Sequence, residues 1–80
     1  MTEKLTVVGI LVDHRAEKSP EVQKVLCDYG KEILMRSGIP SSDHESGLIT
    51  LVVETDKCCV DTLIKRLETI DGVKAKSLDF

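Results

Sequence analysis

The sequence predicts an α+β domain whose elements follow one another in the order β-α-β-β-α-β. Two segments rich in β-branched residues, 5–14 and 48–55, have the composition of strands, and two amphipathic segments, 19–38 and 56–72, begin with helix-start signals. Each helical segment follows one of the strands, so the chain divides into two halves of similar length. Eighty residues leave room for one domain, which we expect to span residues 1–80.

The strand at residues 5–14 is apolar on both of its faces. Its alternating side chains are Leu5, Val7, Gly9 and Leu11 on one face and Thr6, Val8, Ile10 and Val12 on the other. A strand with one solvated face alternates apolar with polar residues, so this strand is expected to be central and covered on both sides. The strand at residues 48–55 is apolar on one face and half apolar on the other.

The two helices are predicted from their terminal signals. The first is expected to begin at Ser19-Pro20-Glu21, where Ser is a favoured N-cap and Pro suits the first helical position. It is expected to end at Ser37-Gly38, since glycine commonly follows the last helical turn, and Arg36 would then be a cation at its C-terminus. The second helix is expected to begin at the N-cap Asp56 and to end at Asp71-Gly72.

The remaining segments are candidates for edge strands. Residues 39–47 have the pattern of a loop or an edge strand, and residues 73–80 that of a short edge strand protected by Lys74 and Lys76. With the two apolar strands in the centre, this order corresponds to the ferredoxin-like fold. We therefore predict a four-stranded antiparallel sheet in the order 4-1-3-2 with both helices on one face.

Two helices cover only one face of such a sheet, so the other face is expected to expose apolar side chains. Exposed apolar patches on small domains mark association sites, and a small aliphatic core gains stability from partner subunits. The sequence therefore predicts a homo-oligomer, dimer or tetramer, that associates through the open face. The residues expected there are Val8, Ile10 and Val12, or Val7 and Leu11, together with Leu48 and Val52.

Composition excludes several classes of function. The formal charge of −3 provides no basic surface for phosphates, so direct nucleic-acid binding is not expected. No apolar run approaches the ~20 residues of a transmembrane helix, and no signal-peptide pattern is present, so we expect a cytoplasmic protein without membrane contact. Three cysteines in that compartment are expected to be reduced thiols.

The sequence contains no motif with a recognisable reaction mechanism. Phosphate-binding glycine loops and hydrolase signatures are absent, so an enzyme is not expected. The candidate metal ligands lack the spacing that brings two of them to one ion, so neither a metal nor another cofactor is expected, and Cys27 is expected in the core. Those candidate ligands are His14, His44, Cys27, Cys58 and Cys59.

The chain resembles the TM1266-type family, named for regulation of the iron-only hydrogenase system. The residues that carry the resemblance are Val8-Gly9-Ile10 through Arg15, Val22-Gln23 with Leu26, Tyr29-Gly30, Arg36-x-Gly38-Ile39-Pro40, Gly47 through Val53, Leu67 and Gly72-Val73. The family is related in shape to ACT domains and to the nickel-sensing domain of NikR-type repressors. Where its members carry Asn before the arginine at the end of the first strand, this sequence has His14.

The resemblance implies an ACT-like regulatory domain that is oligomeric and responds to a small effector. The effector is then expected where strand and helix ends meet, at Asp13, His14, Arg15, Arg36 and Gly38. Two alternatives remain at this stage. One is a protein-interaction or assembly subunit without a ligand, and the other is a metal-responsive transcriptional regulator of the nickel-sensor kind, which would use His14 and His44.

Overall fold

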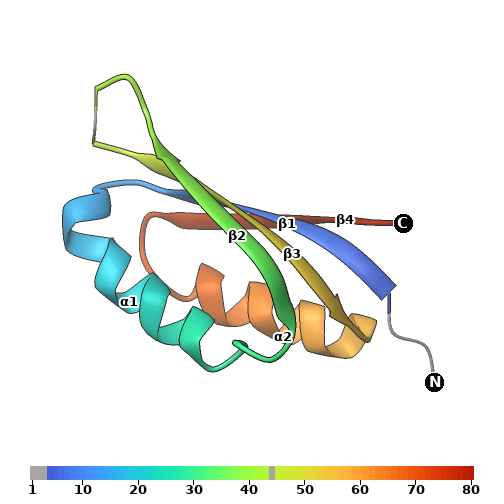
Figure 1. The fold of residues 1–80 in the computed structure, drawn as a ribbon. Coiled ribbons are helices and arrows are strands. Elements are labelled where there is room, and N and C mark those ends of the chain that lie inside the picture. Colours follow the sequence, from blue (N-terminus) through green and yellow to red (C-terminus); the bar gives the residue numbers. More distant parts are fainter. Residues whose placement is uncertain (1–3, 44) are drawn as a thin grey trace.

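A computed structural model of the protein describes residues 4–43 and 45–80, with the backbone alone described at residues 15 and 16. In these residues the elements are β1 (Lys4–Val12), α1 (Arg15–Cys27), β2 (Ile33–Pro40), β3 (Gly47–Thr55), α2 (Lys57–Glu68) and β4 (Val73–Asp79). The strands form one antiparallel sheet in the order β2-β3-β1-β4 (Figure 1). The predicted fold class and strand order are therefore confirmed, with the order read here from the opposite edge.

β1 lies at the centre of the sheet, between β3 and β4. Val8 pairs with Leu51 of β3 and with Ser77 of β4, so the even-numbered residues of β1 share a face with the odd-numbered residues of β3. That face is the buried one, because Val8 and Ile10 have no exposed surface. Burial of each such side chain stabilises the fold by about 1.5–3 kcal/mol.

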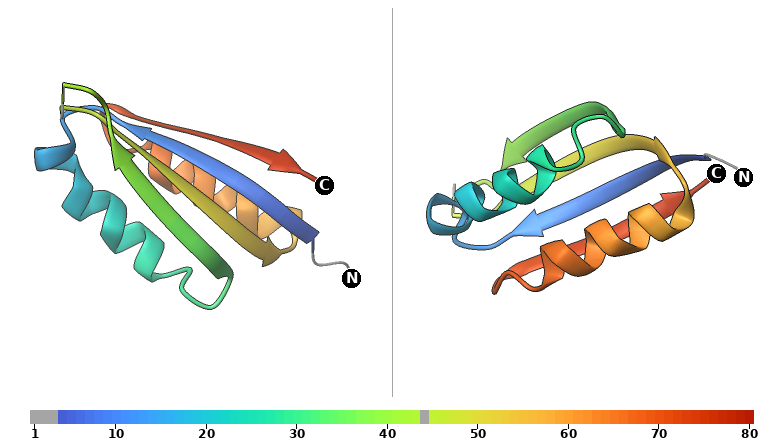
Figure 2. Two further views of the ribbon diagram at one scale, coloured as in Figure 1. Left: turned by 45° about the horizontal axis from the view of Figure 1, so that its top comes forward. Right: turned by 90° about the horizontal axis from the view of Figure 1, so that it is seen from below.

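Both helices cover this same face, as the right-hand view of Figure 2 shows. α1 contributes Val22 and Leu26 to the core, and α2 contributes Val60, Leu63 and Leu67. Where α1 ends, the guanidinium of Arg66 on α2 donates to the Asp28 carboxylate at 2.7 Å and lies 5.4 Å from the centre of the Tyr29 ring. The hydrogen bond to Asp28 raises the pKa of Arg66, and the contact links α2 to the turn that follows α1.

The first helix differs from its prediction at both ends. α1 begins at Arg15 and ends at Cys27, with Pro20 inside it, whereas residues 28–32 form a turn and residues 33–40 form β2. Tyr29 and Ile33 continue the helical spacing of apolar residues, but Tyr29 is buried from the turn, and Ile33, at the start of β2, is partly buried against the core. Cys27 is exposed, so its predicted place in the core was wrong.

This change of boundary moves two predicted site residues from a helix end into a strand. Arg36 pairs with Leu51, and Gly38 pairs with Ile49. The connection between β2 and β3 is the loop 41–46, which belongs to the segment expected to be a loop or an edge strand. In Figure 1 the ends of β2 and β3 that face this segment extend beyond the helices.

α2 begins as predicted. The Asp56 carboxylate accepts a hydrogen bond of 2.8 Å from the backbone N–H of Cys59, which satisfies a donor in the first helical turn. The helix ends at Glu68, and Gly72 then adopts a positive φ of 82° in the turn that leads into β4. A side chain at that φ would be strained, which accounts for glycine there.

We expect Asp56→Ala to lower the free energy of unfolding by about 1 kcal/mol, because the capped N–H would lose its partner. Asp56→Ser should keep most of the stability, since its hydroxyl can accept the same bond. Asp61→Ala is the control: it removes an exposed carboxylate from the same helix and should change stability by less than about 0.5 kcal/mol. Urea unfolding measures all three, and equal losses at positions 56 and 61 would contradict the capping role.

Candidate functional site

The face of the sheet away from the helices carries two rows of apolar side chains. The rows follow from the strand pairing, in which each residue of β1 has a neighbour on β3 and on β4, and β3 continues to β2. From β2 to β4, the first apolar row is Met35, Val52, Val7 and Leu78; the middle row is Ser37, Thr50, Gly9 and Lys76; and the second apolar row is Ile39, Leu48, Leu11 and Lys74.

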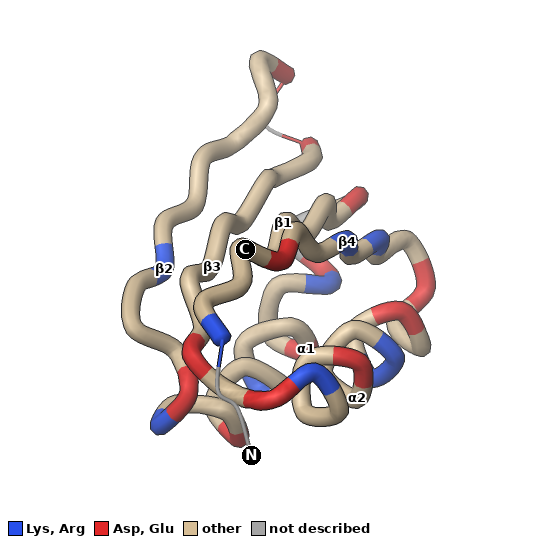
Figure 3. Tube along the Cα trace, turned by 90° about the vertical axis from the view of Figure 1, so that its right-hand side faces the viewer, with Lys and Arg blue, Asp and Glu red and all other residues tan. Residues whose placement is uncertain are grey.

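These apolar side chains are strongly exposed for their size. Leu11 is 40% exposed, Leu48 43% and Ile39 62%. A shallow hollow of about 260 Å³ lies among Gly9, Leu11, Leu48 and the two lysines of β4. Figure 3 shows β1 and β3 largely free of charged residues along their length, with basic residues on β4.

The interface residues predicted on β1 need a correction. Val8, Ile10 and Val12 are 0%, 0% and 1% exposed and lie in the core, facing the helices. The antiparallel register places Leu11 beside Leu48 and Val7 beside Val52 on the open face. The alternative set of Val7 and Leu11 is therefore the one that shares a face with Leu48 and Val52.

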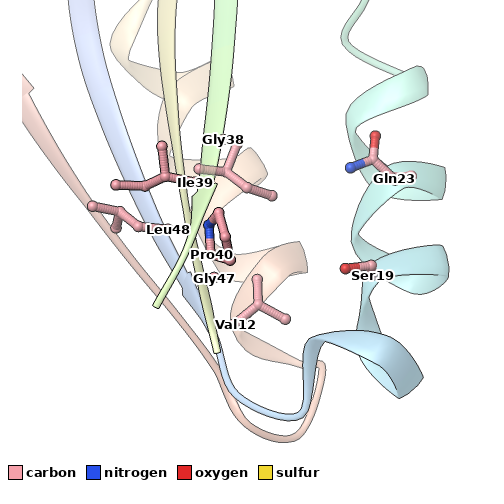
Figure 4. A pocket seen from close by; sticks show the side chains of 9 residues that line it. Val12, Ser19, Gln23, Gly38, Ile39, Pro40, Gly47 and Leu48 are labelled. Atoms are coloured by element: carbon pink, nitrogen blue, oxygen red, sulfur yellow. The ribbon is translucent and has the colours of Figure 1, made fainter. Parts of the chain in front are cut away.

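A crevice of about 220 Å³ opens on the helix side, between α1 and the end of the β2–β3 hairpin. Ser19 and Gln23, one turn apart on α1, form one wall, and Figure 4 shows both side chains directed towards the strands. Gly38 and Gly47 form part of the opposite wall, where their lack of side chains leaves room. Ser19, Gln23 and Gly47 were not predicted as site residues, because they come together only when α1 starts earlier and residues 33–40 form a strand.

The turn after β1 holds the other predicted site residues. The Asp13 N–H donates to the Gly72 carbonyl at 2.9 Å, and the Ser46 hydroxyl donates to the Asp13 carboxylate at 3.0 Å. His14 has a left-handed backbone with φ 52°, an uncommon conformation that Asn and Gly adopt most readily. The Arg15 side chain lies outside the described part of the structure, as does the whole of His44.

The structure does not bring all the predicted effector residues together. Gly38 lines the crevice, and the Arg36 guanidinium donates a hydrogen bond to the side-chain oxygen of Gln23 on the crevice wall. Arg36 lies level with Val8 in the sheet, four residues before the end of β1, or about 13 Å from the Asp13 turn along the strand direction. Gly38 therefore belongs to the crevice, while Asp13 and His14 belong to the turn. Arg36 lines the adjoining hollow with Leu26 and Cys27 and contacts the crevice wall only through Gln23.

The described residues contain no group of three or more His, Cys, Asp or Glu side chains placed to hold a metal ion. Cys58 is exposed and Cys59 half-buried at the start of α2, and Cys59 contributes its backbone N–H to the cap. Within the same described residues, neither helix has the length and apolar character needed to cross a bilayer.

The loop between β2 and β3 is organised by one carboxylate. The Ser41 hydroxyl donates to Asp43, and the Glu45 N–H donates to the same oxygen at 3.0 Å. The Ser41 hydrogen bond, followed by that of Glu45, lowers the pKa of Asp43 from its ordinary value of 3.8. Both bonds favour the ionised form, so at neutral pH the loop has its full set of contacts.

The fold and these surfaces define a class: a small ferredoxin-like α+β domain with one covered and one apolar open sheet face. A family model covers residues 4–77, and its description reads "Iron-only hydrogenase system regulator, putative". The chain belongs to this TM1266-like family, as the resemblance in the sequence indicated. A search of curated proteins finds no match.

Solved structures agree with this assignment. The uncharacterised protein TM1266 from Thermotoga maritima is similar with a TM-score of 0.91 and 27% identity, and the match covers 98% of each chain. The C-terminal domain of the MgtC protein from Mycobacterium tuberculosis has a TM-score of 0.76 at 13% identity, covering 98% of this chain and 88% of that one. At that identity the likeness shows a common fold alone.

We expect His14→Gly to raise the free energy of unfolding by about 0.5–1 kcal/mol, because glycine adopts a positive φ without the Cβ clash. His14→Asn should be neutral or slightly stabilising, and His14→Val should be destabilising by at least about 1 kcal/mol, since a β-branched residue is least compatible with that backbone. Thermal and urea unfolding measure the series. Equal free energies of unfolding for His14→Val and His14→Gly would contradict the left-handed conformation at this position.

The loop should respond to acid in a defined direction. Because the folded pKa of Asp43 lies below its unfolded value, its contribution to stability is complete above pH 3.8 and is lost as pH falls through the folded pKa. NMR titration should give an Asp43 midpoint below 3.8, and Ser41→Ala should raise it. A midpoint at 3.8 or above in the native protein, or no change in Ser41→Ala, would contradict the hydrogen-bonding arrangement.

Proposed function

We propose that this chain is a regulatory domain that acts as a homodimer, formed when the open face of its sheet packs on the same face of a second copy. The observation that carries the proposal is the pair of apolar rows exposed on that face. The family description supports a regulatory role. The charge of −3 favours regulation through contacts between proteins over direct contact with nucleic acid.

The size of the face sets the expected strength of the dimer. Strands lie about 4.8 Å apart and residues about 3.3 Å apart along a strand, so four strands of about eight residues span roughly 500 Å². Specific stable interfaces bury about 800 Å² per partner. Side-chain relief increases the contact area above the planar value, but the face remains small for a specific interface, so we expect a weak dimer.

The lysines of β4 favour one orientation of the second copy. A two-fold axis that runs across the strands would place Lys76 over Lys76 of the second copy. A two-fold axis parallel to the strands places β2 of one copy over β4 of the other, and each apolar row over the same row of the second copy. The Lys76 side chains of the two copies then lie about three strand spacings, or ~14 Å, apart. Separation beyond the ~10 Å Debye length removes most of their repulsion, so the parallel axis is preferred.

The same axis gives Gly9 a function in the contact. It places Thr50 of the second copy over Gly9, and Leu48 over Leu11. A Cβ added at Gly9 would meet no atom of its own chain within 4 Å, so packing within one copy does not require glycine there. The depression at Gly9 instead suits a side chain from the opposing sheet, at the ~10 Å spacing of packed sheets.

We expect the native protein to sediment as a dimer at tens of micromolar, and Leu11→Lys to weaken the dimer at least tenfold by burying an unpaired charge. Leu34→Lys is the matched control. Leu34 is 58% exposed but lines a different hollow, with Leu26 and Cys27, so its change should leave the dimer intact. A native protein that stays monomeric at these concentrations would contradict the proposal. Equal weakening of the dimer by Leu11→Lys and Leu34→Lys would also contradict it.

A second variant separates association from folding. Gly9→Val should leave the monomer as stable or stabilise it by up to about 1 kcal/mol, because valine favours strands and has open space here. The same change should weaken the dimer, since the added side chain occupies the place of Thr50 from the second copy. Sedimentation at several concentrations gives the dimer constant, and urea unfolding of dilute protein gives the stability. A dimer unaffected by Gly9→Val would rule out the parallel axis.

A further inference from the structure

We infer that the crevice between α1 and the β2–β3 hairpin is a binding site for a small aliphatic carboxylate, with Arg36 as the group that recognises the carboxylate. The crevice lies on the helix side of the sheet, opposite the face proposed for dimerisation. The inference therefore goes beyond the homodimer and can be tested on a monomer.

The size of the crevice limits its ligand to a small molecule. A volume of about 220 Å³ corresponds to about seven water molecules at ~30 Å³ each. Pockets for drug-sized ligands and cofactors measure about 300–1,000 Å³, so the space that this crevice itself provides suits a smaller molecule. A molecule with a short branched carbon chain and one polar group matches the space.

The walls divide into an apolar part and a polar part. Val12, Ile49 and Pro40 provide aliphatic surface beside the bare backbone of Gly38 and Gly47. Across the space, the Ser19 hydroxyl and the Gln23 amide are directed from α1 towards the strands (Figure 4). A ligand with an aliphatic body would contact the strands and present its polar end to α1.

Arg36 adjoins the polar wall of the crevice. It lines the neighbouring hollow with Leu26 and Cys27, and its hydrogen bond to Gln23 brings its guanidinium to the crevice wall. It lies two residues before Gly38 on the same strand face, about 7 Å away, and its guanidinium is held by the Gln23 oxygen. A guanidinium has five N–H donors in a planar fork, and the Gln23 bond uses one of its nitrogens. The other nitrogens can bind a carboxylate, which makes charge-assisted hydrogen bonds roughly twice as strong as neutral ones.

A larger side chain at position 38, which is glycine in this protein, would fill the crevice. A Cβ added there would lie 3.7 Å from the Ile49 side chain and 3.8 Å from the Leu48 carbonyl oxygen, both ordinary contacts. Gly38→Leu should therefore fold normally and fill the space with its own side chain. Gly30→Ala, in the turn after α1, meets its nearest atom at 3.5 Å and does not line the crevice, so it is the matched control.

The test uses three probes of nearly equal shape: isovalerate, isovaleramide and isopentylamine. Amide NMR spectra should show saturable shifts with isovalerate at Gly38, Gly47 and Ser19. The amide and the amine should bind at least tenfold more weakly because they lack the carboxylate. Arg36→Gln should weaken isovalerate binding at least tenfold, Gly38→Leu should abolish it, and Gly30→Ala should leave it unchanged.

Each contrary result overturns a stated part of the inference. No saturable shift at the crevice up to roughly 10 mM isovalerate would exclude the site for this class of ligand. Equal binding of all three probes, or unchanged binding in Arg36→Gln, would exclude carboxylate recognition by Arg36. Leu11→Lys, which targets the proposed dimer face, should bind isovalerate like the native protein, so failure of the dimer and failure of the site are measured separately.

Discussion

The pairing register of β1 is the constraint on which the rest of this molecule depends. β1 lies between β3 and β4, and Val8 faces the same side as Leu51 while Gly9 faces the same side as Thr50. The helices cover the side of Val8, so that set becomes the core and the other set becomes the open face. A slip of one residue would exchange the two sets. Register therefore decides both which side chains stabilise the fold and which ones the open face exposes.

This dependence on register explains which parts of the fold could be predicted from the amino-acid sequence. A strand apolar on both faces has to be central, and that was enough for the strand order and for an apolar open face. The same property prevented a choice between the two faces of β1, since Val8 and Leu11 are equally suited to a core. The choice depends on whether even residues of β1 pair with odd or even residues of β3, and only the three-dimensional pairing supplies that.

The first helix shows how tertiary contacts can overrule a regular pattern. Tyr29 and Ile33 fit the spacing of an amphipathic helix, yet the chain gains more by pairing Ile33–Pro40 with β3 along the length of both strands. A continued helix would leave β3 as an exposed apolar edge, which proteins avoid. Arg36 and Gly38 were selected through the family resemblance, but their neighbours Gln23 and Gly47 in the crevice could be found only once α1 and β2 had their actual limits.

The two proposed surfaces share the β2–β3 hairpin, and this gives a physical route between them. Gly38 and Gly47 line the crevice, and Ile39 and Leu48, which follow them in the chain, border the same crevice and also lie in the second apolar row. A ligand that moved the hairpin relative to α1 would move Ile39 and Leu48 with it, because both residues belong to the two paired strands of the hairpin. Where binding changes the strength of the dimer in this way, linkage requires the dimer to change the affinity for the ligand by the same factor. Such reciprocity is what a regulatory domain needs, and a single hairpin that carries both proposed surfaces is sufficient to supply it.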